Sequence, residues 1–371
     1  MGFSAFLFSV VRSYILIMLI GAAACANNTT CQFQSLYQFG DSTSDTGNLV
    51  RILPFGPFLP AARQPYGRTF PGKPTGRWSD GRLIIDFSAA SVGLPPLNPY
   101  LKKYASFENG VNFAVAGATA LNMSFFTSKG IIVPLSVGSL ARQLTWFRRH
   151  LTTICSGPSD CADRLNKSLI FMGEIGSNDI NYPLTQGKSL EEIKTYVPFI
   201  IQAIVNATRE IIRAGASQIV TAGNFPIGCF PYTLSAFSSN DSTDYDENGC
   251  IKRLNNLAIY QNSNLQTALY SLRREFPNVV ILYADYYNAF LTILRQAPIL
   301  GFDRRTLLSP CCQSRDYNPT SPQFCGGIGV PVCDNPNQYV HWDGLHLTEA
   351  VHRQISKIID TNLVLGKNCT F

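Results

Sequence analysis

Short apolar runs alternate with longer segments of helical periodicity along this chain, and this alternation constrains the fold more than any other feature. The apolar runs cover residues 33–39, 169–173, 218–222 and 279–284, and each is followed by a polar segment or by glycine and proline. Runs of this length are typical of strands that lie buried in a parallel sheet. A further run, 110–118, has the pattern of a strand that ends in small residues.

Between these runs the spacing of apolar residues predicts helices. They cover 82–92, 139–153, 193–214, 251–276 and a last segment that Thr348 caps and that runs to about residue 363. Ser79 and Asp80 are expected to cap the first of these helices, and Pro198 to shorten the front of the third. Strands that alternate with helices predict an α/β fold, a doubly wound, mostly parallel sheet with helices on both faces. No linker, composition shift or internal repeat divides residues 27–371, so they are expected to form a single domain.

The segment 309–337 departs from this pattern, because it has no periodicity and contains five prolines, three glycines and four cysteines. A loop of this length is usually functional or disordered, and its cysteines favour a loop that disulfides hold in place. Elsewhere, two local bridges are plausible, Cys155 with Cys161 and Cys229 with Cys250. The sequence leaves the remaining pairings open.

Residues 1–26 have the features of a secretory signal peptide. Arg12 is their only charge, residues 14–24 are apolar, and Ala24-Cys25-Ala26 is a cleavage site of small residues. The alternative is an uncleaved anchor helix, but the apolar stretch is short for a membrane span. Cleavage after Ala26 leaves ten of the eleven cysteines, an even number that suits an oxidising compartment.

Seven sequons for N-glycosylation also indicate the secretory pathway. They begin at Asn27, Asn28, Asn122, Asn166, Asn206, Asn240 and Asn368. We expect a monomeric glycoprotein without a stable membrane span, either extracellular or vacuolar. The excess of 30 Lys and Arg over 24 Asp and Glu is dispersed, so no nucleic-acid partner is expected.

The first candidate for chemistry is Ser42, in the polar segment 40–48 that follows the first predicted strand. Sites in open parallel sheets form at the carboxyl ends of strands, and a serine near the start of a helix has free N–H groups beside it. A nucleophilic serine needs a base, which is usually histidine. Of the four histidines, His346 follows Asp343 by three residues, so the carboxylate can turn back onto the ring. The alternatives are a plain turn at Ser42 and a surface histidine near the start of a helix.

The other three histidines lack this arrangement. His150 lies between basic neighbours in a predicted helix and is expected to be a solvated charge, and His352 lies in the last helix. His341 has no acidic neighbour except Asp343, which can serve only one ring well. Candidate donors to an oxyanion are the Gly117 N–H and the Asn178 side chain, each at the end of a predicted strand. The alternative is that Gly117 is a glycine needed only for packing and that Asn178 only caps a loop.

Taken together, these segments resemble the GDSL esterases and lipases of plants, within the SGNH hydrolase superfamily. Four blocks occur in the family's order: residues 39–48, 110–114, 176–179 and 342–346. The resemblance implies the three-layer, flavodoxin-like sandwich of that superfamily. It also implies a catalytic triad of Ser42, Asp343 and His346, and an oxyanion hole built from the Ser42 and Gly117 N–H groups and the Asn178 side chain. Asp41, Asp45 and Asn48 are expected to brace the turn.

Within the family, the tracts 81–87, 109–121 and 283–289 are most similar to acetylajmalan esterases and sinapine esterases. This similarity implies a secreted serine ester hydrolase that acts on a small ester of a plant specialised metabolite, with deacetylation of an indole alkaloid as the best single hypothesis. It implies no cofactor and no metal. The alternatives are a general lipase or carboxylesterase, an acyltransferase that uses the same acyl-enzyme, and a glycoprotein that binds a ligand without catalysis.

Overall fold

A computed structural model describes residues 33–52, 54–134, 138–312, 324–362, 364–365 and 369–370 of the 371-residue chain. Its central feature is a five-stranded sheet in which every neighbouring pair of strands is parallel. The strands are β1 (Ser35–Phe39), β2 (Gly110–Asn112), β3 (Ser168–Met172), β4 (Gln218–Ala222) and β5 (Val280–Ala284), in the spatial order β2-β1-β3-β4-β5. This is the doubly wound order predicted from the alternation of strands and helices.

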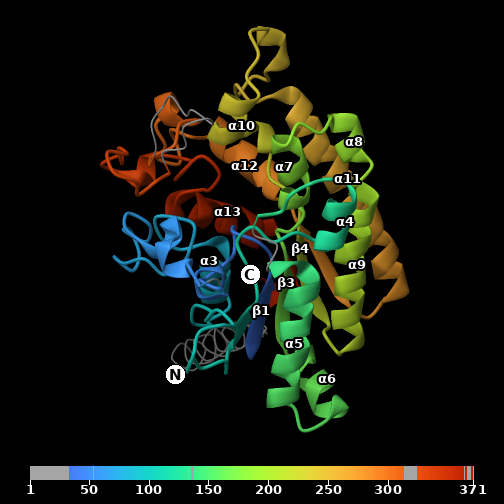
Figure 1. The fold of residues 1–371 in the computed structure, drawn as a ribbon. Coiled ribbons are helices and arrows are strands. Elements are labelled where there is room, and N and C mark those ends of the chain that lie inside the picture. Colours follow the sequence, from blue (N-terminus) through green and yellow to red (C-terminus); the bar gives the residue numbers. More distant parts are fainter. Residues whose placement is uncertain are drawn as a thin grey trace, which may run out of the picture.

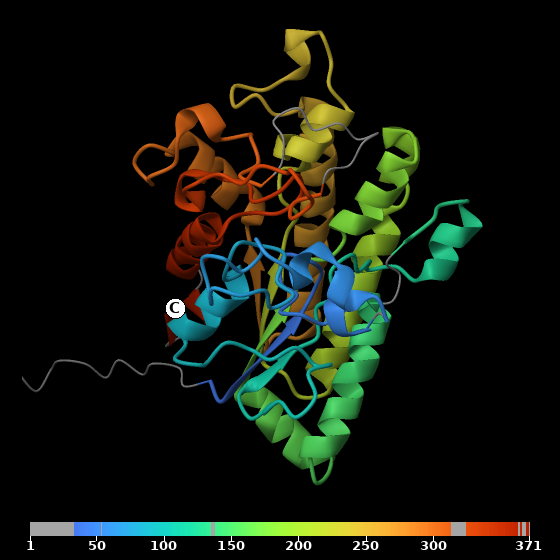
Figure 2. The same cartoon turned by 60° about the vertical axis from the view of Figure 1, so that its left-hand side comes forward.

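Alternate side chains of β1, β3, β4 and β5 enter two separate hydrophobic cores. On β3, for example, Ile170 and Met172 belong to one core, whereas Leu169 and Phe171 belong to the other. The first core includes residues of α5 (Leu140–Ile154), α9 (Val197–Arg213) and α11 (Lys252–Glu275); the second includes residues of α3 (Ile84–Ser91), α12 (Tyr286–Arg295) and α13 (Glu349–Asn362). Figures 1 and 2 show these two helical layers on opposite sides of the sheet.

The remaining helices of the described residues are short and lie in the connections between strands and layers. They are α2 (Leu49–Ile52), α4 (Met123–Ser128), α6 (Pro158–Asn166), α7 (Ser177–Thr185), α8 (Leu190–Lys194) and α10 (Pro231–Ala236), with 3₁₀ turns at Gly56–Phe58, Pro60–Ala62, Ile227–Cys229, Ser242–Asp244, Arg304–Thr306 and Pro336–Gln338. A small antiparallel pair, β6 (Val364–Leu365) and β7 (Cys369–Thr370), follows α13. Within the described ranges, no helix is both long and apolar enough to cross a membrane.

Two of the predicted helix starts are confirmed and one is wrong. Pro198 stands in the first turn of α9, and Thr348 accepts a hydrogen bond from the N–H of Val351 in α13. Asp80, expected to cap the helix that follows it, instead accepts the backbone N–H of Glu349 at 2.7 Å and so caps α13. A sequence pattern cannot predict this exchange, because α13 is distant in the chain and only the packing of α3 on α13 brings its first turn to Asp80.

Four disulfides lie within the described residues. Cys155–Cys161 and Cys229–Cys250 confirm the two local bridges. Cys311–Cys333 and Cys312–Cys325 close the predicted stapled loop, of which residues 313–323 lie outside the described part. This loop is joined to the segment before α13, because the N–H groups of Cys311 and Cys312 donate to the carbonyls of His341 and Trp342.

The prediction that His150 is a solvated charge is wrong. The side chain is 3% exposed and contacts the rings of Tyr37, Phe107 and Phe113, and its Nε2 has no hydrogen-bond partner in the described part of the chain. Burial lowers the pKa of His150 to about 4. Its basic neighbours point to solvent, but His150 lies on the opposite, buried face of α5.

We therefore expect His150→Leu to weaken the dependence of stability on acid pH. Between pH 6.5 and 4 the unfolded chain binds a proton at His150 that the folded chain does not, so the native protein loses up to about 3 kcal/mol from this residue as the pH falls. Leucine fills a similar volume and does not titrate. Urea unfolding of both proteins from pH 7.5 to 4 measures the difference, and parallel curves would contradict this account of His150.

Candidate active site

The sequence places Ser42 directly after β1, at the carboxyl edge of the sheet. The chain runs from β1 out to β2 on one side and then to β3 on the other, so Ser42 lies at the point where the winding direction changes. This is where binding sites form in open α/β sheets. The expectation that Ser42 lies near the start of a helix is wrong, because the next helix, α2, begins only at Leu49. Ser42 lies in a turn instead.

The backbone before Ser42 is held by Gln143 of α5. The Gln143 side chain accepts the Gly40 N–H at 2.9 Å and donates to the Gly40 carbonyl at 2.8 Å. Gly40 has a φ of +154°, and a Cβ there would lie 2.9 Å from the carbonyl oxygen of Glu174, so the approach to β3 needs glycine. The carbonyl of Asp41 then accepts the N–H groups of Ser44 and Asp45, which closes the turn around Ser42.

Asp45 and Asn48 brace this turn, as predicted from the sequence. The Asp45 carboxylate accepts four backbone N–H groups, those of Gly47, Asn48, Leu49 and Ala116. The Asn48 side chain donates to the carbonyls of Asn112, the last residue of β2, and of Ala114. These bonds fix the Ser42 turn to the loop that carries Gly117.

His346 and Asp343 form the second part of the site, in the tight turn before α13. Nδ1 of His346 lies 2.9 and 2.8 Å from the two carboxylate oxygens of Asp343. The Asp343 carboxylate also accepts the Leu345 and His346 N–H groups and, at 2.7 Å, the hydroxyl of Tyr66. Burial by itself would raise the pKa of Asp343, but His346 and these hydrogen bonds hold the pKa below its usual range. The carboxylate therefore stays ionised and keeps the ring proton on Nδ1.

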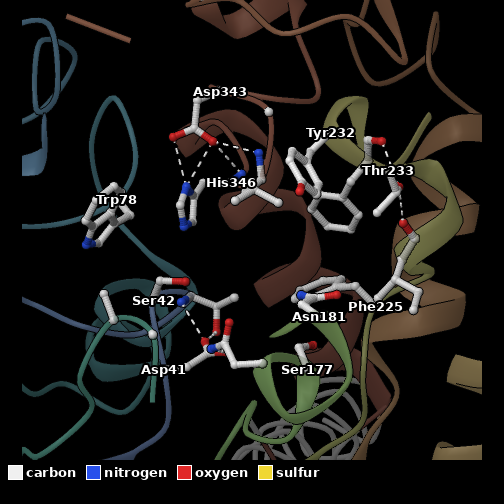
Figure 3. A pocket seen from close by; sticks show the side chains of 18 of the residues that line it. Asp41, Ser42, Trp78, Ser177, Asn181, Phe225, Tyr232, Thr233, Asp343 and His346 are labelled. Carbon is white, nitrogen blue, oxygen red and sulfur yellow. Dashed lines mark hydrogen bonds and ion pairs between the residues drawn. The ribbon is translucent and has the colours of Figure 1, made fainter. Parts of the chain in front are cut away.

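Ser42 and His346 line the same cavity, of about 590 Å³. In Figure 3 the His346 ring lies between the Asp343 carboxylate and Ser42, with Trp78 on one side and Phe225 and Tyr232 on the other. The Trp78 ring centroid is 5.1 Å from that of His346. With Nδ1 protonated, Nε2 of His346 carries the lone pair that can accept a proton.

The three predicted oxyanion donors line this cavity too. Neither the Ser42 N–H nor the Gly117 N–H has an acceptor among the described residues, which leaves both able to bind a substrate oxygen. Gly117 has a φ of +79°, a conformation that favours glycine. Asn178, in the first turn of α7, donates from Nδ2 to the Asp41 carboxylate and to the Ala118 carbonyl, each at 3.0 Å.

The remaining histidines do not line the cavity. His341 and His352 are buried, and neither ring has a hydrogen-bond partner in the part of the chain that is described. Burial lowers the pKa of each to about 3, so both are neutral. His341 instead packs against Phe230 and Phe290.

The sequence did not identify the aromatic wall of the cavity. Its rings come from segments far apart in the chain and are Tyr66, Trp78, Tyr182, Phe225, Phe230, Tyr232 and Phe324. For Phe225 a signal existed, since it follows the strand β4 at the same edge of the sheet as Ser42. Tyr66 and Trp78 carry no such signal, because they lie in the irregular segment between α2 and α3.

A parallel α/β sheet with a serine, a histidine and an aspartate around one cavity at its carboxyl edge is an arrangement typical of serine hydrolases. The family model described as GDSL-like lipase/acylhydrolase matches residues 36–359. The chain belongs to this family, as its sequence blocks predicted, and is a carboxylic ester hydrolase.

Several named relatives are similar over nearly the full length. Acetylajmalan esterase 2 of Rauvolfia serpentina is 51% identical over 371 residues, which are 100% of both chains. Acetylajmalan esterase of the same plant is 48% identical over all of this chain and 94% of its own. Sinapine esterase of Brassica napus is 41% identical over 94% of this chain and 90% of its own. These similarities confirm the predicted resemblance to both kinds of esterase.

Proposed function

We propose that Ser42 is the nucleophile of this esterase, with His346 as general base and Asp343 as its partner. The observation that carries this proposal is the shared cavity, in which His346 has its Nδ1 on Asp343 and its Nε2 available. His346 takes the proton of Ser42 as the serine oxygen attacks the ester carbonyl, and then gives it to the leaving alcohol. A water molecule that the same histidine activates then releases the acid from the acyl-enzyme.

The proposed oxyanion hole consists of the Ser42 N–H, the Gly117 N–H and the Asn178 side chain. The two backbone groups are supported by their lack of internal acceptors in the described residues. The Asn178 amide already donates to the Ala118 carbonyl and to the Asp41 carboxylate. It must therefore share one of these two hydrogens with the substrate oxygen, or release it from its present acceptor, as negative charge develops on that oxygen. A hydrogen bond that becomes strong only when this negative charge develops stabilises the transition state rather than the bound substrate.

The proposed substrate is a small ester of a specialised metabolite, with an acetylated indole alkaloid as the best single candidate. The names of the Rauvolfia relatives support the alkaloid, and the aromatic wall of the cavity suits a rigid ring system. Hydrolysis of a broader range of esters, as by a general lipase or carboxylesterase, is the second candidate. Acyl transfer to an alcohol instead of water is a third, because it uses the same acyl-enzyme.

We expect the purified protein to release acetate from an acetylated indole alkaloid faster than it releases fatty acid from a long-chain acylglycerol. The reason is that a cavity of about 590 Å³ with aromatic walls encloses a compact ring system better than an extended chain. Product analysis with each substrate, with and without an added alcohol, measures hydrolysis and transfer together. Preference for the acylglycerol would refute the alkaloid while leaving the esterase assignment intact.

We also propose that the chain enters the secretory pathway, is cleaved after Ala26, and acts as a glycosylated monomer of one domain, residues 27–371, in the vacuole or outside the cell. The four disulfides support an oxidising compartment. Of the predicted glycosylation sites, Asn122, Asn166, Asn206 and Asn240 are exposed, and Asn27, Asn28 and Asn368 lie outside the described residues. Gel mobility after deglycosylation and light scattering would test these proposals.

A further inference from the structure

The cavity contains two carboxyl groups that the proposed mechanism does not use. Asp41 is 2% exposed and Glu174 is 1% exposed, and both line the same cavity as Ser42. They come from the ends of neighbouring strands, where the Asp41 N–H donates to the Glu174 carbonyl, and each carboxyl group acts on the pKa of the other. None of the described residues that line the cavity is a lysine or an arginine. Two adjacent buried carboxyl groups without a cation cannot both be ionised, so they hold a proton between them.

Their hydrogen bonds indicate which group holds that proton. Asp41 accepts from the N–H and hydroxyl of Thr43 and from the Asn178 side chain, and these donors stabilise a carboxylate. Glu174 accepts the Ser177 N–H on Oε1, whereas its Oε2 has no hydrogen-bond partner in the described chain. Burial, followed by the charge of Asp41, raises the pKa of Glu174 well above its usual range. Burial also raises the pKa of Asp41, but the bonds from Thr43 oppose that rise.

We infer that Glu174 is a neutral carboxylic acid that donates its proton to the Asp41 carboxylate, and that this pair positions the Asn178 amide and the turn of Ser42. Asp41 is linked to two of the three donors of the proposed oxyanion hole, since it lies next to Ser42 in the chain and accepts from Asn178. In this inference Glu174 acts through Asp41 and Asn178 and is a positioning residue. This inference rests on the proposed function of Ser42 and Asn178.

The arrangement has a consequence at alkaline pH. When Glu174 loses its proton, the two carboxylates repel each other and the support of Asn178 is lost. The other titratable groups that act on the pair are His346 from the turn before α13, Asp179 and Tyr182 on α7, and Tyr286 on α12. Of these groups, only Tyr286 has Glu174 among the causes of its pKa shift, after its own burial, so a variant of Glu174 acts on the pH profile mainly through the pair.

The experiment compares Glu174→Gln with Glu174→Leu. The glutamine amide can donate to Asp41 as the acid does, so kcat should stay within severalfold of the wild type and the decline at alkaline pH should weaken. Leucine fills the site without a donor, so kcat should fall roughly tenfold to a hundredfold with little change in KM. Equal damage from both variants would overturn the inference.

Two further measurements separate positioning from a merely structural role. Asn178→Ala should lower kcat on the order of a hundredfold to a thousandfold. Adding Glu174→Leu to it should have little further effect if Glu174 acts through Asn178, whereas additive losses would contradict that route. The infrared spectrum of the wild type should also contain the carbonyl band of a buried, protonated carboxylic acid that Glu174→Gln removes. If leucine prevents folding, this band and the activity of Glu174→Gln decide the matter.

Labelling of Ser42 by a serine-directed phosphonate distinguishes the two levels of failure. If the wild type is not labelled and Ser42→Ala stays active, the proposed function is wrong and the inference falls with it. If Ser42 is labelled but Glu174→Leu has wild-type kcat and pH profile, the inference alone is wrong.

Discussion

Ser42→Ala and His346→Ala are each expected to lower kcat by a factor on the order of 10⁴ to 10⁶, the largest effect predicted for any single change in this protein. Without the serine oxygen no acyl-enzyme forms, and without the histidine neither the serine nor the hydrolytic water is deprotonated. The two residues act as one unit, so the double variant should be hardly worse than either single variant. Steady-state kinetics with a chromogenic acetate ester measures all three.

His341→Leu is the matched control for the base. His341 is also a histidine near Asp343, but it is buried among phenylalanines without hydrogen bonds in the described residues, so leucine replaces it without breaking a polar contact. We expect its activity to stay within about tenfold of the wild type, because the lost contacts are packing contacts. If it abolished activity while circular dichroism and thermal unfolding stayed native, the assignment of His346 as base would have to be abandoned.

Arg77→Met is expected to destabilise the fold by about 3–5 kcal/mol, since it leaves the Asp86 carboxylate buried without its cation. The Arg77 guanidinium donates to both Asp86 oxygens, at 2.8 and 2.7 Å, and the two side chains are 10% and 0% exposed. The same carboxylate accepts the Leu83 N–H at the start of α3. A loss here therefore also weakens the helix that packs on α13. Denaturant unfolding at neutral pH measures the effect.

Two controls separate the buried charge from the loss of an ion pair. Combining Arg77→Met with Asp86→Leu removes both charges, and most of the stability should return. Arg148→Met breaks an ion pair of equal length, 2.7 Å to Glu210, whose side chains are 56% and 38% exposed. It should change stability by at most about 1 kcal/mol, because solvent screens the pair. Similar losses at Arg77 and Arg148 would show that burial is not the cause.

The sequence by itself determined the parts of this protein whose signals are local. The apolar runs lie where β1, β3, β4 and β5 form, and the alternation with helices predicted the doubly wound sheet. It also predicted two disulfides between cysteines close in the chain, and the pairing of Asp343 with His346, three residues apart in one turn. Such features depend on neighbouring residues, so their patterns can be read directly.

Only the tertiary structure decided the features that need residues from distant segments. In the folded protein His150 is buried in the core, and Asp80 caps α13 instead of α3. The Tyr66 hydroxyl donates to Asp343, which is far from it in the chain. The tertiary structure also placed Asp41 and Glu174 together at the ends of two neighbouring strands, where burial raises the pKa of both carboxyl groups. The physical reason is common to all four: burial and long-range hydrogen bonds are set by which elements pack together, and the residues around a position in the chain do not contain that information.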